Sequence, residues 1–416
     1  MALYSKKLYY KRGGTIYSVD MFTTTAEVGS EYIGIRDGST SVYIKIVSVD
    51  DPNESYLRLR KSGITKSLAK IRGLLLFSLN SAVLTPTPAN YPSTTANGMC
   101  LVGTGSSPYV IRYDWSSTNN RYEKNATAPL DISPGGYPRV IGISGDAQFI
   151  AVPVQSSPFI HTYKYNSDTG KWAKTAAVYP VISTSYYGCY MASFNSDGSV
   201  LVLGNYGDSG AAWHLLVYKW NATNNRFEGT NHCDIQTPRP CYTAMINYPN
   251  YSRCIVPFQE SSPYVYTYSW NATNNRYEKH NDVDVALPTH GTGGWVKSDG
   301  SRMVASSYNG FYSYIWNATN NRYQKTANPS PMYTDYPIYI SAFNDGEYLA
   351  VGRQAGLSIF KWNATNNRYE EDSSLIDDNG ISGTTNGTNQ INCNLKRLVI
   401  TSNTVSPYMK SYTFNG

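Results

Sequence analysis

One motif that recurs along the chain restricts the fold more than any other feature. A full copy is Tyr268-Ser-Trp270-Asn-Ala-Thr-Asn-Asn-Arg276-Tyr277-Glu-Lys279. Near copies are centred on Trp115, Trp220, Trp316 and Trp362, a degenerate copy on Tyr165, and a shortened copy on Phe414. The copies are about 50 residues apart, a period typical of architectures in which every repeat is one supersecondary unit.

Each repeat is predicted to contain four short antiparallel strands, which we name A to D in chain order. Aromatic residues alternate with other residues over 264–270, the period of two that a strand requires. The polar run 271–275 is a turn, and 276–279 is the returning strand D. Pairs such as Asp299-Gly300 favour tight turns between strands A and B. Seven such units predict an all-β chain with a seven-bladed β-propeller.

The two ends of the repeat array predict how the ring closes. The last repeat stops at Gly416 after its strand C, and an apolar segment, 72–77, precedes the first repeat. We expect 72–77 to supply strand D of the last blade, because closure removes exposed sheet edges.

Residues 1–66 lack the repeat and are predicted to form a separate domain. Alternating segments at 15–22, 32–35, 41–47 and 56–60 are separated by turns such as Arg36-Asp37-Gly38. We expect a small β-module of four or five strands at 1–66, which serves as a docking unit, and the propeller at 67–416.

Composition excludes several classes of protein. The net charge of +6 comes without a Lys/Arg cluster, so no nucleic-acid partner is predicted. No run of 18 apolar residues exists and the N-terminus has no signal-peptide core, so neither membrane insertion nor secretion is predicted. The 6 Cys form no C-x-x-C pair and no metal is expected. Cys100 and Cys254 are predicted to be buried thiols, while a Cys233–Cys241 disulfide stays open.

The repeated aromatic and Asn residues are predicted to be structural. Alternation puts Tyr268 and Trp270 on one face of strand C, with Tyr277 opposite them, and blade packing needs such bulk. Asn271 begins an Asn-Ala-Thr sequon that recurs in other repeats. Turn chemistry explains these sequons better than glycosylation does.

Binding residues are expected on the face of the propeller that carries the B–C and D–A loops, which vary between repeats. Variable loops on a rigid scaffold are where binding specificity normally lies. Aromatic residues there can stack on sugars or fill pockets of a protein partner, although packing within the loops is the alternative. The candidates are Tyr91, Tyr137, Tyr187, Trp213, His214, His290 and Tyr336.

No catalytic motif is recognisable in the sequence. The His residues show no H-E-x-x-H spacing, and no G-x-S-x-G elbow or phosphate-binding glycine loop occurs. We therefore expect a protein that is not an enzyme and needs no cofactor. A carbohydrate-active enzyme, which requires convergent carboxylates near the channel, is an alternative.

The blade motif, with Ser-Pro-Tyr before it, resembles the propeller repeats of structural proteins from tailed bacteriophages and prophages. The leader Tyr4-Ser-Lys-Lys-Leu-Tyr-Tyr-Lys-Arg-Gly-Gly, with Arg36-Asp-Gly-Ser-Thr-Ser-Val-Tyr43, is similar to an N-terminal module of the same source. The second repeat departs from the motif at Tyr165, Gly170 and Trp172.

This resemblance implies a virion protein of the tail tip, a fibre or the capsid surface, assembled in the host cytoplasm. Residues 1–66 would dock to other virion proteins, and the propeller would bind a glycan or protein of the host surface. The resemblance assigns no functional residues. The alternative is a propeller lectin or interaction scaffold that is not attached to a virion.

Overall fold

A computed structural model describes the chain as an all-β protein. The described residues are 6–12, 15–22, 32–37, 40–46, 57–61, 64–68, 77–79, 89–95, 98–104, 109–119, 121–125, 138–154, 157–180, 189–205, 215–235, 245–246, 251–258, 262–333, 337–353, 356–372, 390–393, 397–401 and 409–414. The chain divides into two compact units, Met1–Leu76 and Phe77–Gly416. The division falls later in the chain than the boundary expected between residues 66 and 67.

The first unit contains a six-stranded antiparallel sheet in the order β1-β2-β3-β4-β5-β6. Its strands are Lys6–Arg12, Thr15–Phe22, Tyr32–Asp37, Thr40–Ile46, Leu57–Lys61 and Ile64–Leu68. The expectation of four or five strands was too low. It missed β1 and β6, whose lysines and arginines weaken the apolar alternation that marks a strand.

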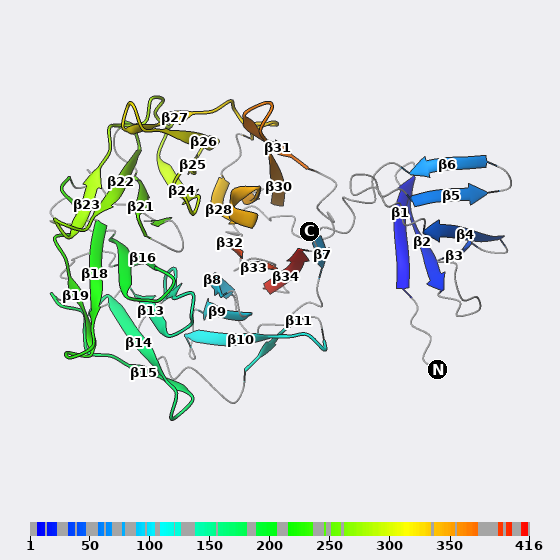
Figure 1. Ribbon diagram of the computed structural model, residues 1–416. Helices are drawn as coiled ribbons and strands as arrows, with labels where there is room; N and C mark the ends of the chain where they lie inside the picture. The colour runs from blue at the N-terminus through cyan, green and yellow to red at the C-terminus, as the bar shows by residue number, and fades with distance from the viewer. Residues whose placement is uncertain are drawn as a thin grey trace. The chain divides into compact units, whose positions relative to one another are not determined.

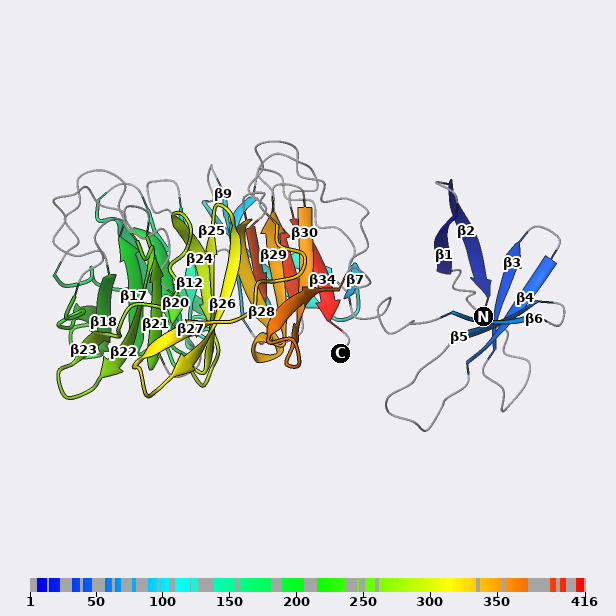
Figure 2. The same cartoon turned by 90° about the horizontal axis from the view of Figure 1, so that it is seen from above.

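The second unit is a β-propeller of four-stranded blades, which surround a common axis in Figures 1 and 2. Six blades each use four strands that are consecutive in the chain, with strand A innermost. Blades 1 to 3 are β8–β11 (Ala89–Thr94, Met99–Thr104, Val110–Ser116, Arg121–Lys124), β12–β15 (Gly142–Ile143, Phe149–Pro153, Ile160–Asn166, Lys171–Lys174) and β16–β19 (Cys189–Phe194, Val200–Asn205, Leu215–Asn221, Arg226–Gly229). Blades 4 to 6 are β20–β23 (Met245–Ile246, Arg253–Pro257, Val265–Asn271, Arg276–Lys279), β24–β27 (Gly291–Val296, Arg302–Ser307, Gly310–Asn317, Arg322–Lys325) and β28–β31 (Pro337–Phe343, Tyr348–Arg353, Gly356–Asn363, Arg368–Glu371).

A further four-stranded sheet, the C-terminal sheet, combines strands from both ends of this unit in the order β32-β33-β34-β7. Its strands are Gln390–Cys393, Arg397–Thr401, Met409–Phe414 and Phe77–Leu79. Strand β7 pairs antiparallel with β34, with Phe77 opposite Phe414. The outer strand therefore lies at Phe77–Leu79 instead of 72–77, and residues 72–76 lie outside the described residues.

The core of the propeller consists of the B and C strands together with the tyrosines of the repeat. Strands β9 and β13 are buried along their whole length. Trp270 pairs with Tyr277 across strands C and D, and their rings meet edge to face at 5.2 Å. Tyr268 and Tyr277 are fully buried, as predicted, but Trp270 is only half-buried. Cys100 and Cys254 are fully buried, which confirms that prediction, and Cys241 lies outside the described residues.

The exposed side of these tryptophans is covered by a cation from the preceding sheet. An Arg or Lys lies over a Trp ring at six junctions within the described residues. The pairs and their distances to the ring centroid are Arg112–Trp172 (4.9 Å), Lys164–Trp220 (5.2 Å), Lys219–Trp270 (4.8 Å), Arg253–Trp316 (4.0 Å), Arg302–Trp362 (4.2 Å) and Arg397–Trp115 (4.1 Å). These cation–π contacts connect one sheet to the next around the propeller.

The segment that leaves each strand D also connects neighbouring blades. After β15, Tyr179 lies parallel to β19 of the next blade, where its N–H binds Phe227 O and its carbonyl accepts from Gly229 N. Corresponding bridges run from Cys233 to β23 and from Ser330 to β31. The outer side of each of these D strands thus carries a parallel backbone partner.

Candidate functional site

The residues that the repeat shares most strictly form a network within the C–D hairpin. Asn271 Oδ1 accepts the backbone N–H of Asn274, while both Asn side chains donate to the Glu278 carboxylate. Arg276 pairs with the same carboxylate at 3.4 Å. Asn275 takes the left-handed conformation with φ 52°, which Asn tolerates better than most residues. The Asn that begins the sequon therefore stabilises the turn, in line with the structural interpretation.

The opposite face, with the B–C and D–A loops, is called the loop face here, and it holds His290. The imidazole is exposed and lies against two rings, 5.9 Å from Tyr264 and 5.2 Å from Tyr308. Tyr264 belongs to the B–C loop of blade 4, and Tyr308 to the B–C turn of blade 5. Among the predicted candidates, His290 is thus placed in a cluster of aromatic rings formed by two blades.

The backbone beside this cluster fits closely. Gly291 donates its N–H to Phe258 O at 2.9 Å. A Cβ on Gly291 would lie 2.5 Å from Tyr264 O and 2.7 Å from Pro257 Cβ, so only glycine fits. Tyr264 itself has φ 61°, an uncommon conformation for a non-glycine residue. The ring positions of the cluster are therefore fixed by the packing of the loops.

The other predicted candidates cannot be compared in this way. Tyr91 lies in β8, but its side chain is not among those described. The remaining five lie outside the described residues: Tyr137, Tyr187, Trp213, His214 and Tyr336.

A second cluster lies buried between blades 4 and 5. Arg253 stacks on Trp316 and approaches His280 Nε2 at 2.6 Å, while Thr267 Oγ1 lies 3.0 Å from His280 Nδ1. Burial, followed by the charges of Arg253 and Lys279, lowers the pKa of His280 to about 3. The neutral ring can then accept a hydrogen bond from the guanidinium. This histidine belongs to the junction between the blades.

The sequence analysis did not predict a groove between blades 1 and 2, on the face of the propeller that carries the A–B and C–D turns, here called the hairpin face. The groove has a volume of about 330 Å³. Its lining residues are Gly98, Met99, Arg112, Asp114, Trp115, Asp146, Ala147, Gln148, Tyr165 and Trp172. The sequence signal that could have located it is the departure of the second repeat at Tyr165 and Trp172.

Within the described part of the chain, no group of three or more His, Cys, Asp and Glu side chains is arranged to hold a metal ion. No helix among these residues has the length and apolar character to cross a membrane.

Comparison with known proteins supports the fold. No family model and no curated protein matches this chain. Among solved structures, the chain is similar to hydrazine synthase of Kuenenia stuttgartiensis, with a TM-score of 0.53 and 11% identity. The match covers 80% of this chain and 97% of that one. At this identity the likeness shows a shared fold alone.

Proposed function

We propose that this chain is a non-enzymatic structural protein of a tailed-bacteriophage virion, whose propeller binds partners through its loop face. The observation that supports the binding role is a difference between the two faces of the propeller. The shared residues of the repeat are engaged in hairpins and blade junctions, as Asn271, Glu278 and Arg253 illustrate. His290 is exposed on the other face and lies against the partly buried rings of Tyr264 and Tyr308. The resemblance of the blade motif supports the virion role.

In this proposal, the protein is assembled in the host cytoplasm and becomes part of the tail tip, a fibre or the capsid surface. Residues 1–66 dock to other virion proteins. The loop face binds a glycan or protein of the host surface, with His290, Tyr264 and Tyr308 as the described part of the contact.

We also infer that the seven four-stranded sheets form one closed ring. Strand β7 completes the C-terminal sheet, and three observations support contact between that sheet and blade 1. Arg397 lies 4.1 Å over Trp115, Val399 and Met409 pack with Cys100 of blade 1, and β32 and β8 are in contact. A chain that lacks residues 69–79 should lose the cooperative melting transition of the propeller. An unchanged melting curve would argue against closure.

Binding by the full-length chain tests the proposed role. Fluorescently labelled protein is added to candidate host cells and, separately, to phage particles that lack this protein. We expect binding to both. The double variant His290→Ala/Tyr308→Ala should bind cells at least about tenfold less tightly, because a few aromatic anchors contribute much of the energy of an interface. It should bind particles normally.

Tyr179→Ala is the matched control, since Tyr179 is also an exposed aromatic residue but lies beside β19, away from the His290 cluster. If the protein binds particles but not cells, it decorates the virion and does not bind the host surface. Binding to neither would contradict the virion proposal and favour the unattached lectin or scaffold.

A further inference from the structure

Blade 2 reverses the Trp–Tyr pair that blades 1, 4, 5 and 6 share. In blades 4, 5 and 6 a Trp on strand C faces a Tyr on strand D, and that Tyr is fully buried. In blade 2, Tyr165 on strand C faces Trp172 on strand D, with 4.9 Å between ring centroids. Trp172 is only half-buried. Its indole Nε1 is buried without an acceptor within the described residues, so the reversal is a poorer solution for packing than the common pair.

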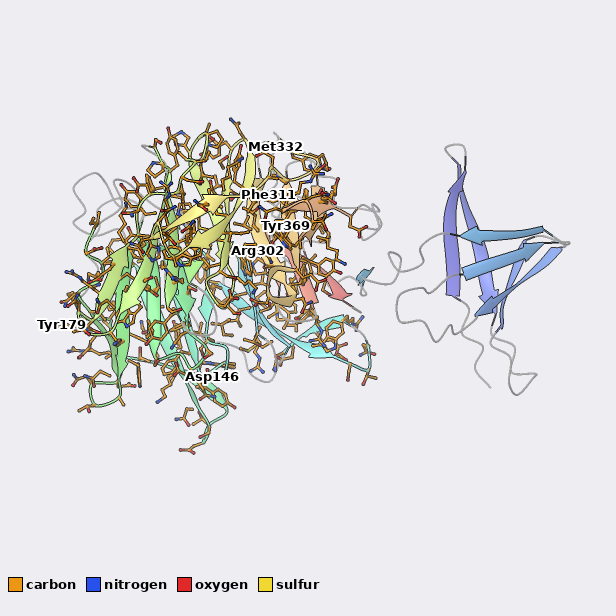
Figure 3. The ribbon with its side chains drawn as sticks, turned by 45° about the horizontal axis from the view of Figure 1, so that its top comes forward. Asp146, Tyr179, Arg302, Phe311, Met332 and Tyr369 are labelled. Atoms are coloured by element: carbon orange, nitrogen blue, oxygen red, sulfur yellow. The ribbon has the colours of Figure 1, made fainter. Side chains whose placement is uncertain are left out.

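The groove lies where this reversal occurs. Trp172 and Tyr165 form its wall on blade 2, and Trp115 lies on the blade 1 side. A volume of about 330 Å³ is at the small end of the range for ligand sites. Asp146, labelled in Figure 3, lies in the A–B turn of blade 2 and belongs to the same lining.

The polar groups of the groove are held in place by their own hydrogen bonds. Arg112 Nε donates to Asp114 Oδ1 at 2.8 Å, and its guanidinium stacks on Trp172 at 4.9 Å. Asp146 Oδ1 accepts from Ser144 Oγ at 2.6 Å and from Gln148 N at 2.9 Å. Each carboxylate has capacity for about four hydrogen bonds, so both can accept more.

The charges of the groove select the class of ligand. The lining carries two carboxylates, Asp114 and Asp146, and the guanidinium of Arg112, while Arg397 lies over Trp115 beside it. These charges nearly balance, which favours a neutral ligand over a charged one. Carboxylates accept hydrogen bonds from hydroxyl groups, and the aromatic rings offer apolar surface for the C–H face of a ring. A small ligand with many hydroxyl groups and one apolar face matches this combination.

We propose that the groove between blades 1 and 2 binds a neutral pyranose sugar. Asp114 and Asp146 accept hydrogen bonds from its hydroxyl groups, Arg112 donates, and Tyr165 and Trp172 contact its ring. The site lies on the hairpin face, away from the His290 cluster, and does not depend on the virion role.

Saturation-transfer NMR of the full-length chain tests the site. The probes are the methyl glycosides of glucose, galactose, mannose and N-acetylglucosamine, with methyl sialoside as the anionic comparison. We expect saturation transfer from the protein to at least one neutral glycoside and none to the sialoside. Failure of all four neutral probes, or equal transfer to the sialoside, overturns the proposal.

The decisive variant restores the common aromatic order. Tyr165→Trp/Trp172→Tyr should change the shape of the groove wall, keep the melting temperature and lose binding. The matched control Trp270→Tyr/Tyr277→Trp introduces the reversal in blade 4 and should leave binding to the sugar unchanged. Undiminished binding by the restored variant would place the sugar elsewhere and overturn the proposal.

A second variant does not depend on repacking. Asp146→Asn keeps the shape of the side chain and removes its charge, so the affinity for the sugar should fall at least about tenfold, the loss expected for a charged hydrogen bond. An unchanged affinity would exclude Asp146 from the site and contradict the proposed chemistry.

Discussion

At the scale of single residues, the hydroxyl groups of four repeat tyrosines bind turns and connections. Tyr268 and Tyr314, on strand C, donate to the carbonyls of Ile235 and Val285 in the segment arriving from the preceding blade. Tyr323 and Tyr369, on strand D, donate to Gly300 and Gly346 in the A–B turn of their own blade, each at 2.6 Å. Each of these buried tyrosines thus also holds a turn or a connecting segment in place through its hydroxyl group.

Tyr323→Phe should lower the free energy of unfolding by about 1–2 kcal/mol, because the buried hydroxyl is lost and the carbonyl of Gly300 loses its partner. Urea unfolding measures the change. Tyr179→Phe, at an exposed position, should change the free energy by less than about 0.5 kcal/mol. Equal effects of the two substitutions would show that the hydroxyl of Tyr323 contributes nothing.

His280 should make the stability depend on pH. Its pKa is about 3 in the folded chain and about 6.5 when unfolded. Between these values the unfolded chain binds one more proton, so stability falls as the pH falls from about 6.5 towards 3.

His280→Thr carries the residue found after strand D in blades 2 and 5, Thr175 and Thr326. The variant should reduce the slope of unfolding free energy against pH by up to about 1.4 kcal/mol per unit in this range. Denaturant titrations at several pH values measure the slope. The same slope in both proteins would mean that His280 is protonated in the folded chain.

At the scale of the element, the C–D hairpin is held by one carboxylate. In blade 6, Asn363, Asn366 and Arg368 surround Glu370 and lower its pKa to about 2. Blade 5 has Gln324 instead, which accepts from Asn317 at 3.0 Å. Arg322 Nε is buried there without a partner among the described residues. Blade 5 is therefore a natural variant of the network.

Gln324→Glu should raise the midpoint of urea unfolding at neutral pH, because Arg322 and Asn320 gain a charged acceptor. The gain should be present above the unfolded pKa of Glu, about 4.3, and lost as the pH falls through the lowered folded pKa. Glu278→Gln, the reverse exchange in blade 4, should lower the midpoint. A gain that persists at low pH would contradict the electrostatic explanation.

The strands were predictable because the repeat displays them many times. A single alternating segment such as 264–270 does not by itself identify a strand. The same segment identifies one when it recurs along the chain between constant Asn-rich and Asp-Gly turns. The burial of Trp was overestimated, since period two gives the face of a strand but not the depth. The predicted closing strand, 72–77, ends where the observed strand, Phe77–Leu79, begins. The prediction followed the apolar run, whereas the observed strand continues beyond that run into residues that carry no repeat motif.

The candidate site was less predictable than the fold. Loop lengths indicate a variable face, but which rings meet depends on tertiary packing, and only His290 can be checked here. The groove was not predicted. Tyr165 and Trp172, which line it, look like ordinary divergence in the sequence, and only the strand register shows that they face each other.

At the scale of the whole molecule, cations over tryptophans connect the sheets in one direction around the propeller. Arg302 of blade 5 covers Trp362 of blade 6 and also approaches Tyr369, beside which it is labelled in Figure 3. Arg397 of the C-terminal sheet covers Trp115 of blade 1 in the same way. The cation–π contact between the C-terminal sheet and blade 1 thus has the same form as the contacts between consecutive blades.

A double-mutant cycle on Arg397 and Trp115, each changed to Ala, should give a coupling energy of about 0.5–2 kcal/mol, as expected for a partly desolvated cation–π pair. The same cycle on Arg302 and Trp362 is the reference, since both residues lie within consecutive blades. Coupling at the reference pair but none between Arg397 and Trp115 would indicate that the ring is open at that junction.

The parallel segments beside the outer D strands have a consequence for crowding. An uncovered outer strand could recruit strands from other copies and lead to aggregation. Along β19, β23 and β31, that hydrogen-bonding side already pairs with a neighbouring segment of the same chain. At these three strands, pairing edge to edge with a strand of another copy is therefore disfavoured.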